Sequence, residues 1–196
     1  MKNKFFVLLI TTLLLTGCRH NTPPQEPGNI SASTPNTSES PAAETHEPYV
    51  VTFDSTTIDG DTITNSVFAN SKLTMLNVWG TYCNPCLNEM PDLGEIATEY
   101  DNKEFQMFGI ICDVTTDASA NDIENAQDLI KATKATTYPH ILLNESLYYN
   151  LVGASDSVPT TYFINQKGEL IGYLIGAQSK ANWITIIDTL LAETGE

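Results

Sequence analysis

The chain has 196 residues, and its 24 acidic side chains outnumber its nine basic ones, which gives a formal net charge of −15. This length suits one ordinary domain with additional segments, and a hydrophobic content of 41% supplies enough apolar material for a core. The few scattered lysines and arginines argue against nucleic acid as a partner, because phosphate binding requires clustered basic side chains. Four cysteines are too few for a disulfide-stapled scaffold.

The first eighteen residues have the pattern of a secretion signal. Two lysines precede an apolar run from Phe5 to Leu15, which is too short for a membrane-spanning helix of about 20 residues but fits the core of a signal peptide. The run ends in Leu15-Thr16-Gly17-Cys18, which resembles the lipobox of bacterial lipoproteins. The resemblance implies that residues 1–17 are cleaved and that lipid on Cys18 anchors the protein at the extracytoplasmic face of the cell membrane. The alternative is an ordinary signal peptide that happens to carry a cysteine.

The next segment is predicted to be a tether. Residues 19–48 contain six prolines and eight serines or threonines, with no aromatic side chain. Such a composition cannot bury enough surface to offset the entropy of ordering the chain. We therefore expect residues 18–48 to form a lipidated N-terminus and a flexible stalk. His20 and His46 lie in this segment but have no cysteine or acidic cluster beside them, so a metal site is not expected there.

From residue 49 to residue 196, short apolar runs alternate with helical patterns. The runs predict strands at Val50–Phe53, Thr62–Thr64, Leu73–Trp79, Phe105–Cys112, His140–Leu143, Thr160–Ile164 and Leu170–Leu174. Apolar residues at helical spacing predict helices at Pro85–Tyr100, Asp122–Ala135, Leu147–Val152 and Lys180–Leu191. Strands that alternate with helices, followed by a hairpin and a last helix, favour an α/β fold with helices on both faces of the sheet.

The motif Cys83-Asn84-Pro85-Cys86 lies where the first long strand meets the first long helix. A thiolate at a helix N-terminus meets unpaired backbone N–H groups and the positive end of the helix dipole. Its pKa falls below the ordinary value of about 8.5, so the thiolate becomes a nucleophile near neutral pH. A second cysteine one turn later can attack a mixed disulfide formed on the first. This reasoning assigns Cys83 as the attacking thiol and Cys86 as the resolving one.

A zinc site is the structural alternative for a Cys-x-x-Cys pair. A closed zinc site needs four ligands, commonly two such pairs or one pair with two histidines. The chain has no second pair, and Cys112 and His140 have no ligand-like neighbours. Neither a metal nor a cofactor is therefore expected.

The segment from Trp79 to Cys86 resembles the active site of the thioredoxin superfamily, and Pro91 falls where that family kinks its first helix. The run Val158-Pro159-Thr160 resembles the family's cis-proline strand. Asn77 stands where cytoplasmic thioredoxins keep a buried aspartate, and Glu89 follows the second cysteine by three residues. These features are similar to the membrane-anchored, TlpA/ResA-like thiol-disulfide oxidoreductases.

The resemblance implies a thioredoxin-like α/β fold with a central mixed sheet flanked by helices, an N-terminal β-hairpin extension and a mid-domain helix-strand insertion. It implies a redox-active disulfide between Cys83 and Cys86, a cis peptide bond before Pro159, and a substrate surface around Trp79, Tyr82, Val158 and Pro159. Glu89 is expected to take a proton or to tune the thiols; the alternative is a solvated helix charge.

The resemblance also implies partners. Relatives of this kind usually act as reductases, which receive electrons from a membrane thiol donor and pass them to oxidised proteins. The implied substrates are apocytochrome c, an extracytoplasmic methionine sulfoxide reductase or other extracytoplasmic proteins. A disulfide-forming oxidase would use the same two cysteines, so the direction stays open at this point.

Two further classes remain as alternatives. A thiol peroxidase of the same superfamily would have a Thr-x-x-Cys spacing and a lone peroxidatic cysteine, whereas here Thr81 is two residues before Cys83 and a vicinal pair is present. A lipoprotein that only binds a partner through an inert fold is the non-enzyme alternative. Cys112 ends an apolar strand and is predicted to be a reduced, buried, structural thiol; a third redox cysteine is the rival interpretation.

Overall fold

A computed structural model describes residues 47–194 of the chain. The predicted signal peptide, the lipid attachment at Cys18 and nearly all of the predicted tether lie outside these residues. Within the described range, no helix has both the length and the apolar character needed to cross a bilayer.

The centre of the domain is a mixed five-stranded sheet with the strand order β5-β4-β3-β6-β7. Its strands are β3 (Leu73–Trp79), β4 (Phe105–Thr115), β5 (His140–Leu143), β6 (Thr160–Asn165) and β7 (Leu170–Ile175). β3, β4 and β5 run parallel, whereas β6 and β7 are antiparallel to their neighbours. β3 is buried at every position, as expected for a central strand covered on both faces.

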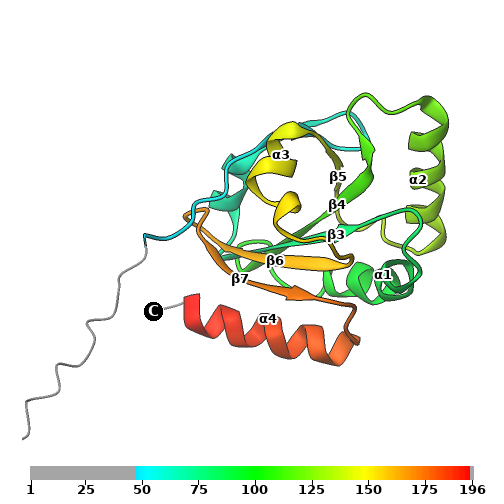
Figure 1. The fold of residues 1–196 in the computed structure, drawn as a ribbon. Coiled ribbons are helices and arrows are strands. Elements are labelled where there is room, and N and C mark those ends of the chain that lie inside the picture. Colours follow the sequence, from blue (N-terminus) through cyan, green and yellow to red (C-terminus); the bar gives the residue numbers. More distant parts are fainter. Residues whose placement is uncertain (1–46, 195–196) are drawn as a thin grey trace, which may run out of the picture. The chain divides into compact units, whose positions relative to one another are not determined.

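One face of the sheet carries the long helices (Figure 1). Side chains of α1 (Asn84–Ile96), α2 (Ala120–Ala132) and α4 (Lys180–Thr194) pack with Leu73, Met75 and Trp79 in one hydrophobic cluster. Because successive strand residues point to opposite faces, Leu76 and Val78 join a second cluster on the other side. There the core is closed by the N-terminal segment, the 3₁₀ segments η1 (Asn65–Asn70) and η2 (Val152–Ala154), and α3 (Glu145–Asn150).

The predicted N-terminal hairpin is present, but its first strand is shifted. β1 (Asp54–Thr56) pairs antiparallel with β2 (Thr62–Thr64), so the prediction of a strand at Val50–Phe53 is wrong. Pairing about the turn at Gly60, which has a φ of 93°, sets Thr56 opposite Thr62 and leaves the earlier residues beyond the hairpin. Val50 instead makes a single bridge to Glu169.

Other differences concern the ends of elements. α1 ends at Ile96 and not at Tyr100, because Thr98 and Glu99 donate their N–H groups three residues back, to Glu95 and Ile96, in the tighter pattern of a helix end. β4 continues to Thr115, beyond the predicted end at Cys112. The mixed sheet, the flanking helices, the N-terminal hairpin and the inserted α2–β5 unit confirm the predicted fold class.

Candidate active site

The two motif cysteines form a disulfide at the N-terminus of α1. Cys83 is the N-cap residue of this helix, and its Sγ accepts a hydrogen bond from the backbone N–H of Cys86 at 3.2 Å. Pro85 lies in the first turn, where its missing N–H is not needed. Cys83 is 5% exposed and Cys86 is 0% exposed. Of the two cysteines, Cys83 is thus the one that both meets a backbone donor and retains some exposed surface.

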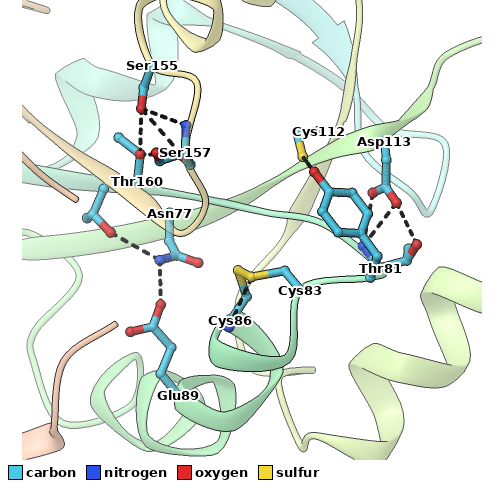
Figure 2. Close-up of a disulfide and its surroundings, with 12 residues drawn as sticks. Asn77, Thr81, Cys83, Cys86, Glu89, Cys112, Asp113, Ser155, Ser157 and Thr160 are labelled. Atoms are coloured by element: carbon cyan, nitrogen blue, oxygen red, sulfur yellow. Dashed lines mark hydrogen bonds between the residues drawn. A yellow bond between two sulfur atoms is a disulfide. The ribbon is translucent and has the colours of Figure 1, made fainter. Parts of the chain in front are cut away.

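The loop before Cys83 is held by an acidic side chain from the neighbouring strand. The Asp113 carboxylate accepts hydrogen bonds from the Thr81 backbone N–H at 3.0 Å and from the Thr81 hydroxyl at 2.5 Å. Figure 2 shows this contact on the side of the disulfide away from Glu89. Asp113 therefore fixes the chain two residues ahead of Cys83.

Glu89 is buried on α1, with 3% of its surface exposed. Its carboxylate accepts hydrogen bonds from Asn77 Nδ2 at 3.1 Å, from the Gln178 backbone N–H at 3.0 Å and from Trp183 Nε1 at 3.3 Å. Burial raises its pKa above the ordinary value, although the three donors act in the opposite direction. The alternative of a solvated helix charge is therefore wrong.

Asn77 links Glu89 on α1 to the central sheet through hydrogen bonds, near the disulfide (Figure 2). Its side chain is fully buried on β3, and Nδ2 donates to both Glu89 Oε1 and Thr161 Oγ1 at 3.1 Å. No donor within residues 47–194 reaches its Oδ1. The Asn77 amide thus has both N–H bonds filled, while its oxygen has no donor among the described residues.

Trp79 is fully buried behind the disulfide and not on the surface that a partner would meet. Its indole Nε1–H donates to His140 Nδ1 at 3.1 Å, and His140 Nε2 lies 2.9 Å from the Ala135 carbonyl oxygen. The two bonds together require the neutral tautomer with the proton on Nε2. Burial lowers the pKa of His140 to about 4, which favours this neutral form.

The other predicted substrate residues lie near the C-terminal end of β3, where the disulfide is located. Tyr82 is 69% exposed, Val158 is half-buried and Pro159 is buried. The Val158-Pro159 bond is cis, as predicted. Thr160 follows and pairs with Val78 of β3. The sheet thereby brings the 158–160 segment to the same end as the disulfide.

Cys112 is a free thiol at the same end of the sheet. It is half-buried, whereas the sequence predicts a buried thiol. β4 continues past it, so its side chain lies next to the Tyr82 ring, with 3.9 Å between Cys112 Sγ and Tyr82 Oη. Burial raises the pKa of Cys112 and keeps it protonated.

The described residues contain no group of three or more histidine, cysteine, aspartate or glutamate side chains placed to hold a metal ion. The two residues weighed for a zinc site are used otherwise. Both ring nitrogens of His140 are hydrogen-bonded within the core, and Cys112 contacts Tyr82.

Comparison with known proteins agrees with this arrangement. A sequence model described as the AhpC/TSA family matches residues 48–172, which is more than half of the chain. The chain belongs to the AhpC/TSA family. Among curated proteins, the chain is 28% identical over 114 residues to the thioredoxin-like protein YneN of Bacillus subtilis. This match covers 57% of this chain and 61% of the relative. It is 31% identical over 111 residues to the thiol-disulfide oxidoreductase ResA of Bacillus cereus, covering 54% of this chain and 56% of the relative.

The chain thus spans little more than half the length of these two curated relatives. Solved structures share its fold over a larger part. A thioredoxin-family thiol:disulfide interchange protein from Chlorobium tepidum superposes with a TM-score of 0.61 at 23% identity, over 74% of this chain and 98% of its own. The exposed lipoprotein thioredoxin Etrx1 of Streptococcus pneumoniae gives 0.57 at 20% identity, over 70% and 98%. The predicted resemblance to ResA-like proteins with a thioredoxin fold is confirmed.

Sequence reasoning missed two supports of the site. No sequence pattern predicts a role for Asp113, because its contact with Thr81 depends on the parallel pairing of β3 and β4. In the sequence, His140 is a candidate only for a metal ligand. Its position in the apolar strand His140–Leu143, where a polar side chain needs a buried partner, is the signal that could have identified it.

Proposed function

We propose that this protein is an extracytoplasmic, membrane-tethered thiol-disulfide oxidoreductase, and that it works as a reductase of protein disulfides. The observation that carries the proposal is the Cys83–Cys86 disulfide at the start of α1, with a backbone N–H on Cys83 Sγ and a buried carboxylate one turn further on. The name of ResA, a thiol-disulfide oxidoreductase, supports it.

In the proposed cycle, the reduced protein attacks a substrate disulfide with the Cys83 thiolate. A bond forms between Cys83 Sγ and one substrate sulfur, and the other substrate sulfur leaves as a thiolate that takes up a proton. Cys86 then loses its proton and attacks Cys83 Sγ. This closes the Cys83–Cys86 disulfide and releases the second substrate thiol. A dithiol donor at the membrane returns the two electrons and completes the cycle.

The positions of the two sulfurs support this division of roles. The Cys86 N–H stabilises negative charge on Cys83 Sγ, together with the dipole of α1. Cys86 is fully buried, so it can reach only a sulfur already attached to Cys83. We assign the proton from Cys86 to Glu89, whose raised pKa makes it a stronger base than an exposed carboxylate.

The substrate is proposed to be an extended protein segment that meets Tyr82, Val158 and Pro159 around the disulfide. Apocytochrome c, an extracytoplasmic methionine sulfoxide reductase and other extracytoplasmic proteins with non-native disulfides are the proposed classes of substrate. A flexible, extended segment would fit a site where Tyr82 is exposed and both cysteines are recessed.

The proposed anchor is lipid on Cys18. It is tested by metabolic labelling with a tagged fatty acid, comparing the parent chain with Cys18→Ala. Label on the parent and none on the variant is the expected result. Label that persists on Cys18→Ala would show that the anchor assignment is wrong.

Two measurements test the activity itself. The reduced protein should turn over a protein disulfide when a dithiol is supplied, and Cys83→Ser should not. The reduction potential then decides the direction, because about −270 mV is typical of a reductase such as thioredoxin and about −120 mV of an oxidase. Turnover of hydrogen peroxide in place of disulfides would favour a thiol peroxidase. Binding of a partner without any exchange would favour a non-enzymatic module.

A further inference from the structure

Near the Cys83–Cys86 disulfide, the side chain of Asn77 has a buried polar atom without a hydrogen-bond partner in the described part of the chain. Its side chain is fully buried in the middle of β3, yet its carbonyl oxygen Oδ1 receives no donor from residues 47–194. A buried acceptor without a donor costs free energy, so such a group in a packed core calls for an explanation.

The orientation of the Asn77 amide is fixed by its other atom. Both hydrogens of Nδ2 are used, one on Glu89 Oε1 and one on Thr161 Oγ1, at 3.1 Å each. The Glu89 carboxylate can only accept, and the Thr161 hydroxyl can accept as well, so the nitrogen faces them and the oxygen faces away. Figure 2 shows the oxygen turned from Glu89 toward the Cys83–Cys86 disulfide. A disulfide has no hydrogen to offer this oxygen.

Reduction of the disulfide creates the missing donor. A dithiol reductant supplies two electrons, the S–S bond breaks, and each sulfur can bind one proton. Cys83 is the sulfur that keeps negative charge, because it receives the Cys86 N–H at the helix N-terminus. The remaining proton therefore stays on Cys86, which is fully buried and one turn from Glu89.

We infer that Asn77 Oδ1 accepts a hydrogen bond from the Cys86 S–H in the reduced protein. This inference rests on the redox cycle proposed above and adds a residue to it. The bond exists only in the dithiol form, so it stabilises that form relative to the disulfide and makes the protein easier to reduce. It also holds the Cys86 proton beside Glu89, the group proposed to take it during the second step.

The S–H stretching band in the infrared spectrum tests the inference directly. The full chain with Cys18→Ala and Cys112→Ala, reduced at a pH where Cys83 is a thiolate, has Cys86 as its remaining S–H group. We expect a band displaced to low frequency by hydrogen bonding. In the same background, Asn77→Leu should return the band to the position of a free thiol. Asn77→Asp retains an oxygen there and should keep the band displaced.

Thr161→Val is the matched control, because it removes a partner of Nδ2 and leaves Oδ1 in place. Its S–H band should match that of the parent. The reduction equilibrium constant should fall about tenfold in Asn77→Leu, which is about 30 mV. The same fall should occur when Glu89→Gln is also present, since this removes any contribution from the altered Glu89 environment.

A free S–H band in the parent, or a band that Asn77→Leu does not move, would overturn the inference, because either result would show that Asn77 Oδ1 does not accept from the Cys86 S–H. Failure of the proposed function would look different. In that case the Cys83–Cys86 pair would not exchange with protein disulfides at all, whatever residue stands at position 77.

Discussion

Trp79 and His140 are joined across the sheet by a hydrogen bond of 3.1 Å from the indole Nε1 to the imidazole Nδ1. They lie on β3 and β5, with β4 between them. The bond passes over Gly109 of β4, the position at which a side chain would stand in its way. The buried indole N–H thereby has an acceptor, because Nδ1 carries no proton in this tautomer of His140.

The first prediction concerns the acid stability of this pair. Because the pKa of His140 is held at about 4, below its ordinary 6.5, the unfolded chain takes up a proton between these values and the native state does not. The free energy of unfolding should therefore fall as pH drops from 6.5 to 4, and His140 contributes about 3 kcal/mol of that fall. In His140→Gln this contribution is lost. Urea unfolding of both proteins at several pH values checks it, and parallel curves would contradict it.

Gly109→Ala should destabilise the protein. A Cβ at this position would overlap the His140 ring and stand 3.0 Å from Trp79 Nε1. Overpacking of this kind costs about 1–3 kcal/mol, measured as a lower urea midpoint with an unchanged slope. Gly172→Ala on β7 is the matched control, since a Cβ there meets no atom within 4 Å. Equal losses in the two variants would show that crowding of the histidine is not the cause.

Cys86→Ser should accumulate mixed disulfides with substrate proteins, because no neighbouring thiol completes the displacement at Cys83. Cys83→Ser should form none. Non-reducing gels followed by mass spectrometry of the captured proteins would give both results and would identify the substrates. Capture by Cys83→Ser and not by Cys86→Ser would reverse the two roles.

Glu89→Gln should slow closure of the disulfide by about a hundredfold, the lower range for loss of a positioned base. In the parent, the rate should rise with pH as Glu89 ionises, and this rise should begin above the ordinary pKa of glutamate because burial raises the value. The variant should lack that limb of the profile. Glu95→Gln, an exposed change on the same helix, should keep it. An unchanged profile in Glu89→Gln would remove its role in proton transfer.

Cys112 should stay reduced when the catalytic pair is oxidised. Its pKa is raised by burial, so the less reactive thiol form dominates at neutral pH. Peptide mapping after mild oxidation should find it free. A disulfide between Cys112 and either Cys83 or Cys86 would instead make it a third redox residue.

The parts of the fold that could be predicted are those set by local pattern. β3 and β5 begin and end where their apolar runs do, at Leu73–Trp79 and at His140–Leu143. The first strand could not be placed in this way, because Val51 and Phe53 are apolar for a different reason. Val51 and Phe53 fill the core beneath the sheet, while pairing in the hairpin is set by the turn at Gly60.

The same distinction between local pattern and long-range contacts applies to the candidate site. Cys83, Cys86 and Glu89 are related by helical spacing, so their proximity is visible in the sequence. The partners of Glu89 come from 12, 89 and 94 residues away, and Asp113 reaches Thr81 across 32. Such contacts follow from strand register and helix docking, which no local pattern specifies.

The bridge between Val50 and Glu169 fixes the first described residues of the domain at one end of the sheet. The backbone of residues 49–51 is hydrogen-bonded to the turn between β6 and β7. Because Asn165 pairs with Leu73, this turn lies at the N-terminal end of β3. The disulfide follows the other end of the same strand, about 20 Å further along its seven residues. Force applied through residues 49–51 would thus act at the end of β3 opposite to the Cys83–Cys86 disulfide.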